Sequence, residues 1–155
     1  MLKSDKFADI ELKYQNASKL VSREVISAGA VAYIIRCEYE ISKKSTVKQD
    51  IIFFADSAEV RFDTAMDWND DHRFLKAAFD TCVYDDFARN EIQFGYAKRP
   101  TTRNNSIEEA KFEVVNHKYT DLSEAKYGIA ILNDCKYGIT VKEGSLRLSL
   151  HKNDT

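Results

Sequence analysis

The chain has 155 residues and a formal net charge of −2, from 23 basic and 25 acidic side chains. This near balance argues against the strongly basic surface with which proteins bind nucleic acid or an anionic membrane. No apolar run approaches the roughly 20 residues of a membrane-spanning helix, so no membrane segment is expected. A hydrophobic share of 44% is typical of a globular protein with a packed core, and the length predicts a single domain over residues 1–155.

Alternation of apolar and polar residues is the main pattern along the chain, and it indicates half-buried strands. In residues 35–41 the charged side chains share one face and the apolar side chains share the other. Further strands are expected at residues 47–54, 60–68, 73–79, 91–96, 111–115, 128–132 and 146–150. Several short antiparallel strands at this spacing predict a mostly β fold, an antiparallel β-sandwich.

Short polar segments separate the predicted strands. Residues 68–72 are expected to form a hairpin turn. Residues 142–145 are expected to form another, in which Gly144 can adopt a positive φ.

Helices are expected only as short segments, and one longer loop is predicted. The loop is the polar stretch of residues 98–105, which contains Pro100, the only proline. Residues 85–90 and 106–111 are the helix candidates, the second with Ser106 as its N-cap.

The cysteines indicate a reducing compartment. Cys37, Cys82 and Cys135 are odd in number and widely spaced, which predicts free thiols in a cytoplasmic protein. No CxxC pair occurs, so no cysteine zinc site is expected.

The other residues that could carry chemistry form no active-site pattern. His72, His117 and His151 stand far apart, without the spacing of metal ligands. Asp63 and Asp67 share a strand face, but the rise per residue places them about 13 Å apart, which is wide for an acid–base pair. We therefore expect neither catalytic nor metal-binding residues in this chain.

Two segments leave alternatives open. Cys135 stands beside Lys136, which could lower the pKa of the thiol, but no histidine near it in sequence could act as a base. The basic residues 98–103 form either a solvated loop or a site for phosphate or sugar hydroxyls.

The second half of the chain resembles the C-terminal region of family-38 α-mannosidases, most closely the cytosolic and bacterial branch. Four blocks carry the resemblance, in the family's order and at about its spacing. They are EIQFGYAKRPTTRN at residues 91–104, AKFEV with HKYTDLSE between residues 110 and 124, YGIAILNDCKYG at residues 127–138 and LRLSL at residues 146–150. The resemblance covers roughly residues 25–150.

The resemblance implies a fold and a parent enzyme. The fold is the supersandwich of galactose-mutarotase-like domains, and the chain is expected to be an incomplete piece of it. The parent is a retaining α-mannosidase that removes terminal α-mannose from glycans. Its zinc and its aspartate nucleophile lie in an N-terminal catalytic domain, so this chain is expected to be non-catalytic and to hold no cofactor itself.

The resemblance also implies partners. The missing catalytic domain is the expected partner. Mannose-containing glycan is expected to bind to the parent enzyme and to meet this chain only there. A sandwich without some of its strands leaves apolar surface uncovered, so self-association is expected. The alternative is a free-standing carbohydrate-binding or structural β-module. Trp68 lies on an alternating apolar face and is expected in the core rather than on a sugar-binding platform.

Residues 133–138 are the predicted substrate-proximal loop, because an apolar strand turns abruptly polar there. Asp134 and Lys136 offer an acceptor and donors for sugar hydroxyls, and Tyr137 offers a ring face. Lys152, where the family usually has arginine after the last strand, is a weaker companion. The alternative for this loop is a plain hairpin with a local Asp–Lys pair.

Overall fold

The computed structural model describes residues 19–71 and 73–152 of the chain. The chain divides into two compact units, which we call unit 1 (Met1–Asp70) and unit 2 (Asp71–Thr155). The expectation that residues 1–155 form a single domain stays a prediction. No helix among the described residues is long and apolar enough to cross a membrane.

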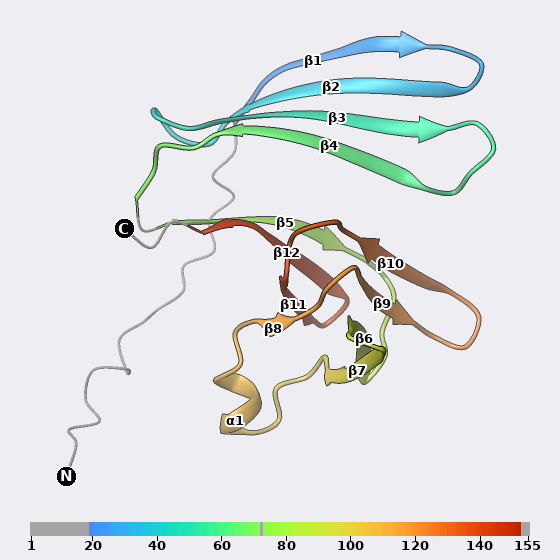
Figure 1. The fold of residues 1–155 in the computed structure, drawn as a ribbon, viewed down its shortest axis with the longest axis vertical. Helices are drawn as coiled ribbons and strands as arrows, with labels where there is room; N and C mark the ends of the chain where they lie inside the picture. The colour runs from blue at the N-terminus through green and yellow to red at the C-terminus, as the bar shows by residue number, and fades with distance from the viewer. Residues whose placement is uncertain (1–18, 72, 153–155) are drawn as a thin grey trace. The chain divides into compact units, whose positions relative to one another are not determined.

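Unit 1 is one four-stranded antiparallel sheet whose strands follow in chain order (Figure 1). Its strands are β1 (Lys19–Ala28), β2 (Ala32–Glu40), β3 (Thr46–Phe54) and β4 (Val60–Asp67). Successive strands pair across short turns, as the alternating sequence predicts for β2, β3 and β4, whereas β1 was not predicted.

The register of these strands separates unit 1 into a charged face and an apolar face. On the charged face Arg36 lies opposite Asp50 and donates two hydrogen bonds to its carboxylate, at 2.8 and 2.7 Å. This pairing lowers the pKa of Asp50. The other face, which we call the apolar face of unit 1, includes six side chains that are 40–51% exposed: Leu20, Val25, Tyr33, Phe53, Val60 and Phe62.

Unit 2 contains two four-stranded antiparallel sheets and one short helix, α1 (Ser106–Glu109). The first sheet, in the order β10-β9-β6-β7, is formed by β6 (Phe87–Ile92), β7 (Gly95–Pro100), β9 (Tyr119–Ser123) and β10 (Gly128–Leu132). The second, in the order β5-β12-β11-β8, is formed by β5 (Phe74–Asp80), β8 (Val114–Val115), β11 (Gly138–Lys142) and β12 (Ser145–Lys152).

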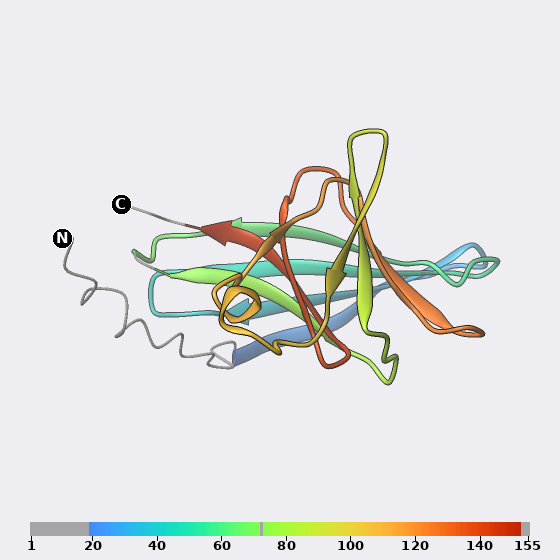
Figure 2. The same ribbon diagram turned by 90° about the horizontal axis from the view of Figure 1, so that it is seen from below.

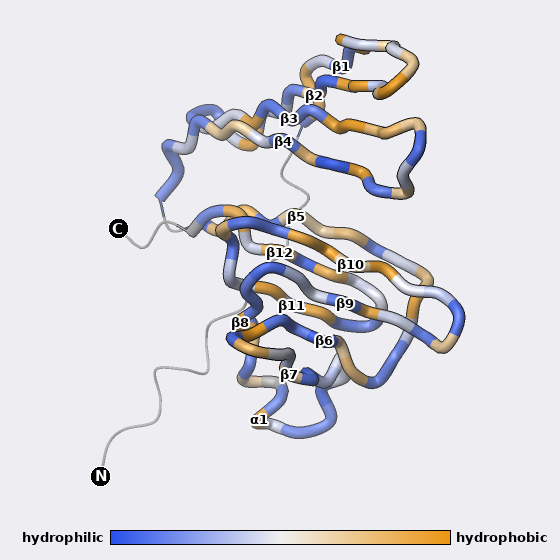
Figure 3. Tube along the Cα trace, turned by 45° about the vertical axis from the view of Figure 1, so that its right-hand side comes forward, coloured by the Kyte–Doolittle hydropathy of each residue, from blue (hydrophilic) through white to orange (hydrophobic). Residues whose placement is uncertain are grey.

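The core of unit 2 joins its two sheets. Ala88 and Leu122 from the first sheet and Leu146 from the second are fully buried in one cluster with Val83. Apolar residues of β10 pack against this cluster, and Figure 3 shows that strand as an apolar stretch. The prediction of a mostly β, antiparallel sandwich is therefore confirmed.

Strand β6 corrects two predictions. The short helix predicted at residues 85–90 is wrong, because residues 87–92 form a strand paired on both edges. The strand predicted at residues 91–96 is also wrong, because the chain turns there between β6 and β7, with Phe94 at φ 62°. Pairing with two neighbouring strands outweighs local helix propensity in this segment.

Other boundaries differ in detail. The helix α1 exists, but its N-cap is Asn105 rather than Ser106, because Asn105 Oδ1 accepts a hydrogen bond from the Glu108 backbone N–H at 2.8 Å. Residues 68–72 do not form a hairpin turn, since β4 and β5 belong to different sheets; His72 lies outside the described residues.

The turn at residues 142–145 is confirmed as the connection of the β11–β12 hairpin. Gly144 has φ 80°, and a Cβ added there would lie 2.9 Å from the Thr81 carbonyl oxygen. Both the backbone conformation and the close approach therefore require glycine.

The core assignment predicts the effect of shortening Leu122. Leu122→Ala is expected to lower the free energy of unfolding by about 2–5 kcal/mol, because it leaves a cavity in a fully buried site. Leu132→Ala is the matched control on the neighbouring strand β10, where the side chain is 77% exposed, and should change stability by less than about 0.5 kcal/mol. Urea unfolding measures both, and equal losses would contradict the core assignment.

Candidate functional site

A shallow hollow of about 560 Å³ lies on unit 2. We call it the Asp134 hollow. Its walls come from the end of β8 and from three separate connections: the β6–β7 turn, the link between β8 and β9, and the loop between β10 and β11. Figure 2 shows these three connections at the same end of unit 2. The lining residues are Gln93, Val115, His117, Lys118, Asp134 and Tyr137.

Backbone hydrogen bonds fix the link between β8 and β9 against β6. The His117 N–H donates to the Glu91 carbonyl oxygen at 3.0 Å. The Lys118 N–H donates to the Glu91 carboxylate at 2.8 Å. Glu91 therefore positions the two residues that carry one wall of the hollow.

The β10–β11 loop is fixed in the same manner. The Asn133 N–H donates to the Lys118 carbonyl oxygen at 2.8 Å, and the Asn116 N–H donates to the Tyr137 carbonyl oxygen at 3.1 Å. Inside the loop, Asn133 Oδ1 accepts a hydrogen bond from the Lys136 N–H at 2.8 Å. The loop is thus held at both ends and across its middle, so its exposed side chains project from a fixed backbone.

The side chains of the hollow combine hydrogen-bonding groups with an aromatic ring. Asp134 offers acceptor oxygens, and Gln93 and Lys118 offer donors. The Tyr137 ring, whose residue is 57% exposed, meets His117 edge-on with ring centroids 5.7 Å apart. This combination of polar groups around a partly exposed ring suits a polyhydroxylated ligand.

Comparison with known proteins identifies the family of the chain. Residues 6–155 match the family described as the glycosyl hydrolases family 38 C-terminal domain. The chain belongs to this family. The match confirms the resemblance seen in the second half of the sequence and extends it toward the N-terminus.

This family-38 C-terminal domain is similar to parts of several curated α-mannosidases. It is 42% identical over 131 residues to Alpha-mannosidase G of Dictyostelium discoideum, covering 82% of this chain and 12% of that protein. It is 44% identical over 111 residues to Alpha-mannosidase 2C1 of Homo sapiens, covering 72% of this chain and 11% of that protein. It is 40% identical over 124 residues to the Alpha-mannosidase of Saccharomyces cerevisiae, covering 78% and 11%. The chain therefore spans about an eighth or less of the length of these relatives.

Of the four site residues predicted from the sequence, two line the Asp134 hollow. Asp134 and Tyr137 line the hollow, whereas Lys136 is half-buried and is not among its lining residues. Lys152 ends β12, and the antiparallel register places that end of the strand at the same end of the sheet as the start of β11. Its side chain lies outside the described part of the chain.

Three lining residues of the hollow were not predicted from the sequence. Gln93, His117 and Lys118 stand 16–41 positions before Asp134, and the alternation of the sequence gives no reason to expect them near it. All three do stand in blocks that resemble the family. Their place in those blocks was the sequence signal that could have identified them as candidate site residues.

Cys135 is not an activated thiol. A hydrogen bond with the Asp134 carboxylate raises the pKa of Cys135 above its ordinary value, and the opposing effect of Lys136 is smaller. Lys136 does lower the pKa of this thiol, as the sequence suggested, but the adjacent carboxylate outweighs the ammonium, so the net shift is upward.

No metal-binding cluster forms among the residues that the structure describes. None of their His, Cys, Asp and Glu side chains gather in groups of three or more that could hold an ion. His117 lies in the Asp134 hollow and His151 lies in β12. The described residues therefore offer no set of zinc ligands, and the zinc that the resemblance implies is expected in the catalytic part of the parent.

The pKa of Cys135 gives a prediction for the Asp134→Asn variant. Removing the carboxylate should lower the pKa of Cys135 toward its ordinary value, which raises the thiolate fraction and speeds alkylation at about pH 8. Iodoacetamide labelling resolved by mass spectrometry measures this, with the exposed Cys82 in the same chain as the internal reference. An unchanged ratio of the two rates would contradict the assigned interaction.

Proposed function

We propose that this domain is the non-catalytic C-terminal part of a retaining α-mannosidase, and that the Asp134 hollow forms part of the wall around the bound sugar. One observation carries the proposal. Three blocks of the chain that resemble the family, separated in sequence, supply most of the lining of one hollow. The curated relatives are named α-mannosidases, and this chain corresponds to 11–12% of their length.

The proposed roles follow from the chemistry of each side chain. Asp134 accepts hydrogen bonds from sugar hydroxyls, while Lys118 and Gln93 donate to hydroxyl oxygens. Tyr137 packs its exposed ring against the apolar face of the sugar. Catalysis belongs to the part of the parent outside this chain. No step of the proposal passes through zinc, because the described residues offer no site for it.

The proposed partner of unit 1 is the rest of the parent polypeptide. Unit 1, as described, is a single sheet with one charged and one apolar face. An amphipathic sheet is stable when another layer covers its apolar face. The catalytic part of the parent provides this covering layer, since about nine tenths of each relative lies outside the matched region.

Two further observations bear on this proposal. Trp68 is half-buried, and its Nε1–H donates to the Asp70 carbonyl oxygen at 2.8 Å, so it does not form the exposed platform of a free-standing carbohydrate-binding module. Cys37, Cys82 and Cys135 are all free thiols, which supports our proposal of a cytoplasmic location.

The test of the hollow uses the longer α-mannosidase polypeptide that carries this domain. Asp134→Ala and Lys118→Ala are each expected to lower kcat/KM for an aryl α-mannoside about tenfold, because each removes a hydrogen bond to the sugar. Lys126→Ala is the matched control, since Lys126 is also exposed but lies in the turn at the far end of the β9–β10 hairpin. Unchanged kinetics in both hollow variants would overturn the role of the hollow.

Without the rest of the parent, the isolated chain is expected to self-associate through the apolar face of unit 1. Val25→Lys on this face should shift the species toward monomer, because a charge in an apolar contact is costly to bury. Val31→Lys is the control, as Val31 lies in the β1–β2 turn and is 74% exposed. Multi-angle light scattering measures the mass. A monomeric state of the unmutated isolated chain at high concentration would contradict the expectation.

A further inference from the structure

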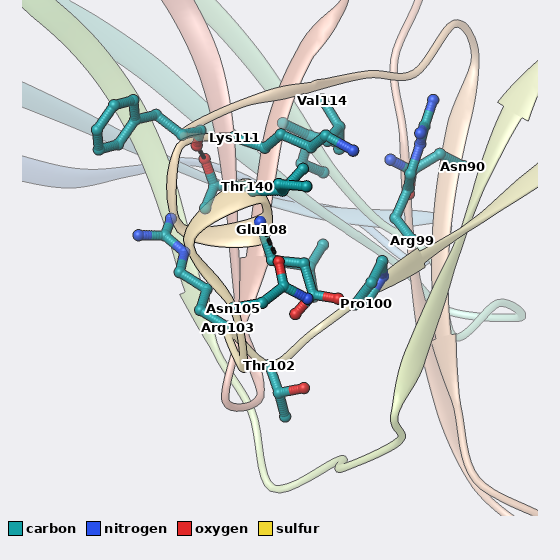
Figure 4. A pocket seen from close by; sticks show the side chains of 14 residues that line it. Asn90, Arg99, Pro100, Thr102, Arg103, Asn105, Glu108, Lys111, Val114 and Thr140 are labelled. Atoms are coloured by element: carbon teal, nitrogen blue, oxygen red, sulfur yellow. Dashed lines mark hydrogen bonds between the residues drawn. The ribbon is translucent and has the colours of Figure 1, made fainter.

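A second cavity of unit 2, of about 220 Å³, has no residue in common with the Asp134 hollow. We call it the Arg99 cavity. It lies among β6, β7, the segment around α1 and β11, and Figure 4 shows its lining side chains. The basic segment of residues 98–103, for which the sequence left a phosphate or sugar site open, contributes several of these residues.

Asn90 is the most informative residue of this cavity. It is fully buried, yet neither Nδ2 nor Oδ1 of its side chain has a hydrogen-bond partner among the described residues. Arg99 Nε is likewise buried and unpaired. Figure 4 shows the two side chains next to each other on β6 and β7. Buried polar atoms are nearly always paired in native proteins, so these two adjacent groups require a partner in the cavity, either ordered water or a ligand.

The charge of the lining favours an anion. Arg99, Arg103 and Lys111 face a single acid, Glu108. Glu108 is already engaged, because its carboxylate accepts a hydrogen bond from the Asn104 N–H at 2.9 Å.

Two of the three cations remain available to a ligand. The Arg103 guanidinium lies over the Phe112 ring, 5.9 Å from its centroid. Arg99 and Lys111, by contrast, form no ion pair within the described ranges. Their donors and the Asn90 amide therefore make the cavity rich in unused N–H groups.

We propose that the Arg99 cavity binds the phosphate group of a small molecule. Arg99 Nε and Asn90 Nδ2 donate to phosphate oxygens, and Lys111 supplies a second positive charge. Asn90 Oδ1 needs a donor, and a protonated phosphate oxygen provides one, whereas a carboxylate does not. This site is independent of the Asp134 hollow and of any role in binding mannose.

The binding experiment titrates the ¹⁵N-labelled chain with inorganic phosphate at constant ionic strength. Saturable shifts are expected at the Arg99 Nε–H and at the Asn90 side-chain NH₂, the two groups that are unpaired without ligand. A parallel titration with glycerol phosphate distinguishes the source of the group: tighter binding of the ester assigns a phosphorylated metabolite, and tighter binding of phosphate assigns the free ion. If neither titration is saturable at these two groups, the cavity holds water only and the proposal is overturned.

Variants make the assignment specific. Arg99→Gln is expected to weaken phosphate binding about tenfold or more, because it removes a charge-assisted hydrogen bond. Lys98→Gln is the matched control, since Lys98 is the neighbouring cation on β7 but is exposed on the opposite face of the strand. Asn90→Leu keeps the volume and removes both polar atoms, and should weaken binding similarly. Equal weakening by Lys98→Gln would mean diffuse charge attraction and would overturn the site.

Discussion

Strand β6 is the element on which both candidate sites depend. It pairs with β7 along one edge and with β9 along the other, so its backbone cannot shift without breaking the first sheet of unit 2. Its register directs Ala88 and Asn90 to the interior, and both are fully buried. Its end carries Glu91, which holds the link between β8 and β9, and then Gln93 in the turn. One strand thus fixes a wall of the Asp134 hollow and the floor of the Arg99 cavity.

Much of the sheet structure follows from alternation in the sequence. Residues 128–132 form a strand with the predicted bounds, and Gly144 adopts the positive φ that its turn requires. These elements are predictable because their signals are local: a run of apolar residues between polar ones, or a glycine at a tight turn. The charged and apolar faces of β2 and β4 follow for the same reason.

The failures have a common physical cause. In residues 87–92 the sequence contains acidic, basic and amide side chains, and only pairing on two edges makes it a strand. The Asp134 hollow could be predicted only in part, through Asp134 and Tyr137. Lys118 and Gln93 join it because Glu91 ties two connections together, and such a tertiary hydrogen bond leaves no periodic trace in the sequence.

The interior face of β6 carries both a residue that stabilises the core and a residue of the proposed phosphate site. Ala88 on this face contributes to the apolar core, whereas Asn90, two positions later, is buried with its amide unpaired. Its register partner on β9, Thr120, is also fully buried with an unpaired hydroxyl. Each such group costs on the order of 1–3 kcal/mol, and an apolar side chain of similar size would avoid that cost.

Packing therefore cannot account for a polar pair at this point of the sheet. The same face is apolar at Leu122, so the strands themselves accept an apolar side chain there. The change from apolar to polar occurs where β6 reaches the Arg99 cavity and its unpaired cation. A ligand that forms hydrogen bonds with these atoms removes the penalty of leaving them unpaired, and this gain favours its binding. Ligand binding thus gives a physical reason for a polar pair at this position.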